Sequence, residues 1–161
     1  MDEERWSLLE KRIAALEAAR ADTAAVTDHE AFWALRGVKE RSDGRSVLLW
    51  TGAVDLPGGE RYEWQEAADA ASVLDADPTV AVAALSALAH PVRLGLLLKV
   101  LQGRRTVTEL GEGLGTSGQL YHHLRQLTEA GWLDAVGRGT YAVPGARVVP
   151  LLTLLATAGL R

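Results

Sequence analysis

The chain has 161 residues, of which 48% are hydrophobic and 24% charged, a balance typical of a globular protein that can bury a core. It contains no cysteine, which excludes disulfides, thiolate nucleophiles and cysteine-ligated metals. It has no apolar run of roughly 18 residues and an acidic start, Met1-Asp2-Glu3-Glu4, so we expect no membrane span, no signal peptide and a cytoplasmic location.

The net charge of −4 is unevenly distributed along the chain. Residues 1–80 contain 9 Lys and Arg against 17 Asp and Glu, whereas residues 81–161 contain 8 against 4. An acidic and a basic half present different surface fields, so the sequence predicts two functional parts. We expect a region for oligomerisation or signal input at 1–78 and a second domain at 79–161, separated at Asp75-Ala76-Asp77-Pro78.

Residues 3–20 are predicted to form the first helix. Its apolar residues recur at spacings of three and four: Trp6, Leu9, Ile13 and Leu16. A seam of about two heptads is too short to be stable alone, so we expect it to pack on the body of the protein or on a second chain. Leu9, Ile13 and Leu16 are therefore candidate dimer contacts.

A second short helix is predicted from Thr27, which is spaced to form a capping box with Glu30, and carries Phe32, Trp33 and Leu35. A β-hairpin follows over about 45–66, with a turn at Pro57-Gly58-Gly59. The aromatic residues of this half either line a ligand or partner surface or form a small local core. They are Trp33, Trp50, Tyr62 and Trp64.

Beyond Pro78 the signals for helices and turns become denser. Two capping boxes, Thr106 with Glu109 and Thr116 with Gln119, predict the starts of two short helices that are separated by glycines. The complete set of predicted elements is helices at 80–89, 91–101, from 106 to Gly113 and from 116 to 130, strands at 132–136 and 140–143, and a last helix at 145–158.

Two helices joined by a glycine-containing turn and followed by a two-stranded ribbon with Arg138 at its tip are the element order of a winged helix-turn-helix. The fold class is therefore predicted to be mainly α with small β elements (α+β), with an N-terminal helix and hairpin before the winged domain. On the second helix of the motif one side is apolar: Leu120, Leu124 and Leu127. The opposite side carries Gly118, His122, Arg125 and Glu129.

Several segments of the second half resemble the ArsR-type winged-helix repressors: Ala87-Leu88-Ala89-His90-Pro91-Val92-Arg93-Leu94, Thr108-Glu109-Leu110, Leu120-Tyr121-His122-His123-Leu124-Arg125-Gln126-Leu127 and Glu129-Ala130-Gly131-Trp132-Leu133. The resemblance covers about residues 80–158. It implies a homodimeric repressor that places the helix from Ser117 to Ala130 in the major groove of duplex DNA. Metal-sensing members use cysteine pairs, or His and Asp on the last helix, and this chain has neither.

The predicted DNA contacts lie on the second helix of the motif, on the wing and before the first helix. They are Thr116, Ser117, Gln119, Tyr121, His122, Arg125, Arg138, Arg104 and Arg105. One alternative for Tyr121 stays open, that it is half-buried on the helix flank. A separate alternative stays open for the arginine pair 104–105, that it is only solvated. The last helix is apolar around most of its circumference, which favours a dimer interface over packing against the N-terminal half alone. Its candidate contacts are Val148, Leu151, Leu152 and Leu155.

The sequence contains no catalytic, nucleotide-binding or cofactor motif, so we expect no enzyme and no cofactor. His122 and His123 are adjacent on a helix and diverge by about 100°, which argues against a shared metal. We therefore expect a dimeric DNA-binding transcriptional regulator, with duplex DNA and a second copy as partners. Two alternatives remain: a winged helix that binds only proteins, or a sensor of a small-molecule or protein effector that uses the tryptophan-rich region.

Overall fold

The computed structural model of the chain describes Trp6, residues 10–15 and residues 31–160. Its residues group into two compact units, Met1–Ser46 and Val47–Arg161, and each is considered by itself. This division differs from the boundary predicted at 78/79, because the β-hairpin packs on the last helix and so lies within the second unit. The charge composition indicated where the sequence changes from acidic to basic, whereas tertiary contacts determine which segments fold as one unit.

The first unit contains short helical segments with exposed apolar side chains. Residues 10–15 are helical, and α2 spans Trp33–Ser42 and ends at Asp43, whose φ of 50° is left-handed. None of the described side chains of this unit is buried, and Ile13 and Trp33 are exposed. Leu9, Leu16 and the predicted Thr27–Glu30 capping box lie outside the described residues, so the apolar seam stays a prediction.

The second unit begins with the predicted hairpin, which starts two residues and ends three residues later than expected. Strands β1 (Val47–Asp55) and β2 (Arg61–Asp69) are antiparallel, and their register places Gly52 opposite Trp64. The strands meet at a turn in which the Leu56 N–H donates to the Glu60 carbonyl at 2.8 Å and Gly59 adopts a φ of 90°. Asp69 ends β2 and caps α3 (Ala70–Asp75), a helix that the sequence analysis did not anticipate.

The winged helix-turn-helix elements follow in the predicted order. Helices α4 (Thr79–Leu88), α5 (Pro91–Leu101), α6 (Val107–Gly111) and α7 (Ser117–Glu129) are succeeded by strands β3 (Asp134–Gly137) and β4 (Thr140–Ala142) and by α8 (Gly145–Thr157). In the described part of the chain no single helix has the length and apolarity to cross a membrane, although the bent pair Ala81–Leu88 and Pro91–Leu101, at 85°, has them jointly. The predicted α+β class is confirmed.

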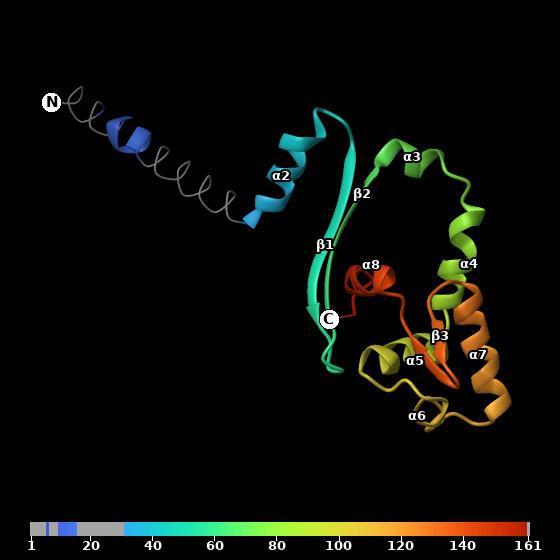
Figure 1. The fold of residues 1–161 in the computed structure, drawn as a ribbon. Helices are drawn as coiled ribbons and strands as arrows, with labels where there is room; N and C mark the ends of the chain where they lie inside the picture. The colour runs from blue at the N-terminus through green and yellow to red at the C-terminus, as the bar shows by residue number, and fades with distance from the viewer. Residues whose placement is uncertain (1–5, 7–9, 16–30, 161) are drawn as a thin grey trace. The chain divides into compact units, whose positions relative to one another are not determined.

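The hydrophobic core lies among the helices of this second unit. Its most deeply buried members come from α5, α6, α7 and α8 and the segment before β3, namely Leu96, Leu97, Leu110, Leu124, Leu127, Leu133, Val148 and Leu151. Figure 1 shows α8 between the hairpin and the helices α4, α5 and α7, and α8 contacts both hairpin strands. Burial on two sides is what an almost entirely apolar helix requires.

The packing of α8 corrects the reason given for a dimer through that helix. Val148, Leu151 and Leu155 are buried within a single chain and Leu152 is half-buried, because the core covers one side and the hairpin the other. The close approach of the hairpin to α8 depends on Gly52, because a Cβ at this position would lie 2.9 Å from Cγ1 of Val149. The apolar circumference of α8 therefore does not by itself call for a second chain.

Candidate nucleic-acid interface

Both helices of the helix-turn-helix begin with the capping boxes that the sequence predicted. The Thr106 N–H donates to Glu109 Oε2 at 2.9 Å, and the Glu109 N–H donates to Thr106 Oγ1 at 3.3 Å. At α7 the Gln119 N–H donates to Thr116 Oγ1 and the Thr116 N–H to Gln119 Oε1, both at 3.4 Å. These reciprocal bonds satisfy backbone donors that a helix start leaves unpaired, and so define where each helix begins.

Glu109 connects α6 to the residues before it. Hydrogen bonds from the Thr106 backbone, the Thr106 hydroxyl and the Arg105 backbone lower the pKa of its carboxyl, because they favour the charged form, and the charge of Arg104 acts in the same direction. Glu109 is therefore ionised at neutral pH and is committed to the helix start.

The two faces of α7 are those expected from its sequence. Leu120, Leu124 and Leu127 are buried in the core, which holds the helix on the domain. The exposed residues of the opposite face are Gly118, Tyr121, His122, Arg125, Thr128 and Glu129. Tyr121 is 53% exposed, so about half of the side chain is accessible in the groove.

The wing is a small ribbon that gains a third partner from the chain before α6. Strands β3 and β4 pair through Ala135 and Tyr141, and the Tyr141 N–H also donates to the Arg105 carbonyl at 3.0 Å. The Val107 N–H donates to the Gly139 carbonyl at 2.9 Å. Arg138 at the tip is exposed, and no described residue pairs with it by a hydrogen bond or ion pair.

An open groove of about 560 Å³ lies between α7 and the wing. It is lined by Gly118, Tyr121, His122, Arg125 and Thr128 of α7 and by Ala135 and Tyr141 of the wing. Hydroxyl, imidazole and guanidinium groups in such a groove can donate to phosphates or base edges. The structure thus brings the exposed face of α7 and the wing together on one side of the domain.

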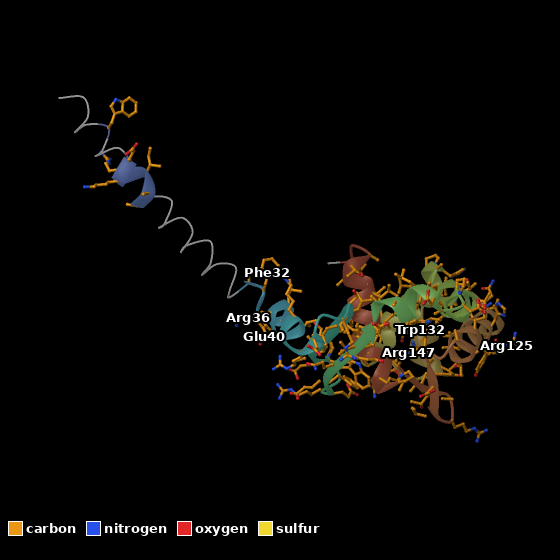
Figure 2. The ribbon with its side chains drawn as sticks, turned by 90° about the horizontal axis from the view of Figure 1, so that it is seen from above. Phe32, Arg36, Glu40, Arg125, Trp132 and Arg147 are labelled. Carbon is orange, nitrogen blue, oxygen red and sulfur yellow. The ribbon has the colours of Figure 1, made fainter. Side chains whose placement is uncertain are left out.

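The cations predicted to bind DNA differ in how they are placed. Arg125 forms an i,i+4 ion pair with Glu129, with Nε 3.8 Å from Oε1 and both side chains more than two-thirds exposed (Figure 2). Arg104 is exposed, whereas Arg105 forms an ion pair with Glu60 of the hairpin turn. Arg125, Arg104 and Arg138 are thus accessible, and Arg105 is largely engaged within the protein.

The residues at the start of α7 are also accessible, with one qualification. Thr116, Ser117 and Gln119 are exposed. The hydroxyl of Thr116 and the Oε1 atom of Gln119 each accept one hydrogen bond of the capping box, while the Nε2 amide group of Gln119 stays available to donate to a base edge. The Ser117 hydroxyl forms no hydrogen bond to another described residue.

The aromatic residues predicted as a ligand or partner surface belong to both units. Trp33 is 65% exposed on α2 of the first unit. Trp50, Tyr62 and Trp64 are half-buried on the hairpin, and Tyr62 packs against the core. Nε1 of Trp50 is buried and has no hydrogen-bond partner among the described residues, whereas Nε1 of Trp64 donates to Glu66 at 3.3 Å. Tyr62 thus contributes to the packing of the hairpin against the start of α8, where a Cβ at Gly145 would lie 3.4 Å from its ring.

Three structural interactions around the motif were not foreseen. The Arg93 guanidinium donates to the Ala87 and Ser86 carbonyls and to Oε1 of Gln126, tying the end of α4 to α7. Nε1 of Trp132 donates to the Ala84 carbonyl at 2.9 Å, and Arg147 lies over its ring at 5.1 Å (Figure 2). Each joins residues at least six positions apart, which local patterns do not reveal.

Two histidines from different helices, His90 and His123, are in ring contact. His90 caps α5 by accepting the Val92 N–H at Nδ1, and its ring centroid lies 4.9 Å from that of His123. Burial lowers the pKa of His123, and the neighbouring His90, His122 and Arg93 lower it further. His122 points to the exposed face of α7. Among the described residues no group of three His, Cys, Asp or Glu side chains is arranged to hold a metal ion.

Comparison with known protein families agrees with this geometry. Residues 88–134 match the family model described as a helix-turn-helix domain. The matched segment runs from the end of α4 through α5, α6 and α7 to the start of β3. A search of curated proteins finds no match to the chain. The helix-turn-helix supports a DNA-binding regulator.

Proposed function

We propose that the chain is an ArsR-type transcriptional regulator that binds specific duplex DNA as a homodimer and represses transcription. The observation that carries the proposal is the exposed face of α7 beside the wing, inside a segment that matches a helix-turn-helix domain. In this arrangement α7 lies in the major groove, where Ser117, Gln119, His122 and Arg125 reach base edges. Arg138 and Arg104 contact phosphates on either side.

The homodimer is proposed to form through apolar side chains that a single chain leaves uncovered. Val73 and Leu74 at α3, and Val82 and Leu85 on α4, are each more than half exposed. Side chains of this kind on neighbouring helices are typical of protein interfaces. Leu9, Ile13 and Leu16 are proposed as a separate set of dimer contacts, on the basis of their spacing in the sequence. Two-fold symmetry then places two copies of α7 on successive major grooves and requires a palindromic site.

The proposal is tested by selecting bound sequences from a random duplex library. The affinity for the most enriched sequence is then measured by fluorescence anisotropy at two salt concentrations. We expect a palindrome whose affinity falls steeply with salt, as phosphate contacts release counterions. Arg125→Ala should weaken binding by about 1–3 kcal/mol, because a well-placed arginine contact to a base contributes that much. Recovery of no sequence by the folded protein at low salt would reject the proposal and favour a protein-binding winged helix.

The chain supplies a matched control for Arg125→Ala. Arg36 on α2 forms the same i,i+4 ion pair, with Nε also 3.8 Å from the Glu40 carboxylate (Figure 2). Arg36→Ala removes an equal charge and an i,i+4 ion pair from α2, which is not part of the helix-turn-helix; the Arg36 side chain is less exposed than that of Arg125, 44% against 68%. Its DNA affinity should remain that of the unmodified chain, and an equal loss in both variants would show that only net charge matters.

A further inference from the structure

Arg105 lies at the junction of three elements. Its carbonyl accepts the Tyr141 N–H of the wing, and its N–H donates to Glu109 at the start of α6. Its side chain forms the ion pair with Glu60 in the turn of the hairpin β1–β2, and both side chains are 30% exposed. One residue therefore connects the hairpin to the wing and to the first helix of the motif.

The hairpin turn is held against this junction by more than the ion pair. Gly103 has a φ of 93°, and a Cβ at that position would lie 3.6 Å from the Gly58 Cα atom, in contact with the turn. Leu56, at the start of the turn, packs against the core. Oε2 of Glu60 and Nε of Arg105 are buried without a hydrogen bond among the described residues, so their opposite charges are the main compensation for burial.

We propose that Glu60 is a positioning residue for the wing, acting through Arg105, and that Arg105 is not a phosphate contact. The inference rests on the proposed DNA-binding function. The ion pair aligns the backbone of Arg105, Thr106 and Val107, and this segment holds the wing through the Tyr141 and Val107 hydrogen bonds. The β-hairpin thereby sets where Arg138 meets the DNA backbone.

The two roles of Arg105 predict opposite effects of Glu60→Ala. If Arg105 binds phosphate, loss of Glu60 frees it, and DNA affinity and its salt dependence rise. If Glu60 positions the wing, affinity falls by about threefold to tenfold, the range of a partly buried ion pair. Glu63→Ala on β2 is the matched control, because it removes the same charge from the same hairpin and has no partner among the described residues. Affinity equal to or above that of Glu63→Ala would overturn the proposal.

A charge exchange and an amide measurement complete the test. The double variant Glu60→Arg/Arg105→Glu should regain the affinity that each single substitution loses, which a phosphate-binding Arg105 would not permit. Hydrogen exchange of the Tyr141 and Val107 amides should quicken in Glu60→Ala and not in Glu63→Ala. Unchanged exchange overturns the inference even if the chain binds no DNA, so its failure and that of the proposed function are distinguishable.

Discussion

The chain contains two β-ribbons that are stabilised in different ways. The hairpin β1–β2 has nine-residue strands and lays one face, with Trp64 and Gly52, on α8. The wing β3–β4 has strands of four and three residues, and β3 is exposed throughout. The wing is held by backbone hydrogen bonds to residues 105–107 instead.

A two-stranded ribbon is marginal in water, so each needs an additional anchor. Half-buried side chains such as Tyr62 pack the hairpin against the core, whereas the wing combines backbone pairing with residues 105–107 and the half-buried Tyr141, and keeps β3 and its tip exposed. This difference fits the proposed function, in which the wing contacts DNA and the hairpin does not. The ion pair between Glu60 and Arg105 is where the two ribbons are connected.

The largest effect is expected where the hairpin meets α8. Gly52→Val should lower the free energy of unfolding by about 1–3 kcal/mol, because the added side chain overpacks against the buried, β-branched Val149. Chemical denaturation measures the loss. Ala53→Val adds similar bulk to the next residue, which is exposed, and should be near neutral. If the two variants are equally stable, the hairpin is not anchored through this face.

Removal of the wing-tip arginine should separate binding from stability. Arg138→Ala should weaken DNA binding by about 1 kcal/mol and reduce the slope of log affinity against log salt by about 1, since one phosphate contact is lost. The free energy of unfolding should not change, because the side chain is exposed. Arg61→Ala on the hairpin, which breaks the 2.8 Å pair with Asp55, is the control and should leave binding intact. A loss of stability in Arg138→Ala would contradict this view of the wing.

Acidification should have a smaller effect on stability, and it should separate the hairpin from the helices around His123. The pKa of His123 is lowered in the folded chain, so the unfolded chain binds the proton more readily. The free energy of unfolding should therefore fall as the pH drops below about 6.5, the ordinary pKa of histidine. Amide exchange should quicken first in α5 and α7, beside His90 and His123, and not in the hairpin, which contains no histidine.

His123→Gln should remove this dependence between about pH 6.5 and 5 while retaining the fall at lower pH. That lower window comes from carboxyls such as Glu109, whose pKa is lowered by hydrogen bonds and whose contribution is lost as they protonate. A wild-type stability that is flat from pH 7 to 5 would show that His123 does not sense protonation.

Local sequence rules predicted the helix-turn-helix accurately. The Thr106–Glu109 and Thr116–Gln119 boxes act within four residues, so their geometry follows from the sequence alone. The same holds for the inward face of α7, because Leu120, Leu124 and Leu127 obey the helical period. The exposed members of the candidate site followed from that period as the opposite face.

What the sequence did not reveal lies where distant segments meet. Arg105 and Arg104 were predicted together as DNA contacts because both are basic and adjacent, and the pairing of Arg105 with Glu60 depends on a hairpin 45 positions earlier. The apolar circumference of α8 favoured a dimer interface, and the contacts that α8 makes with both hairpin strands are not visible in its own sequence. Neither point concerns secondary structure.

The sequence by itself determined the order of the elements, the capping of α6 and α7, and which face of α7 is exposed, because these depend on interactions over one or two helical turns. Only the tertiary structure decided that the hairpin covers α8 and that Glu60 holds Arg105. Such contacts depend on how a closed core brings remote residues together, and neither periodicity nor composition encodes the pairing of two particular side chains across it.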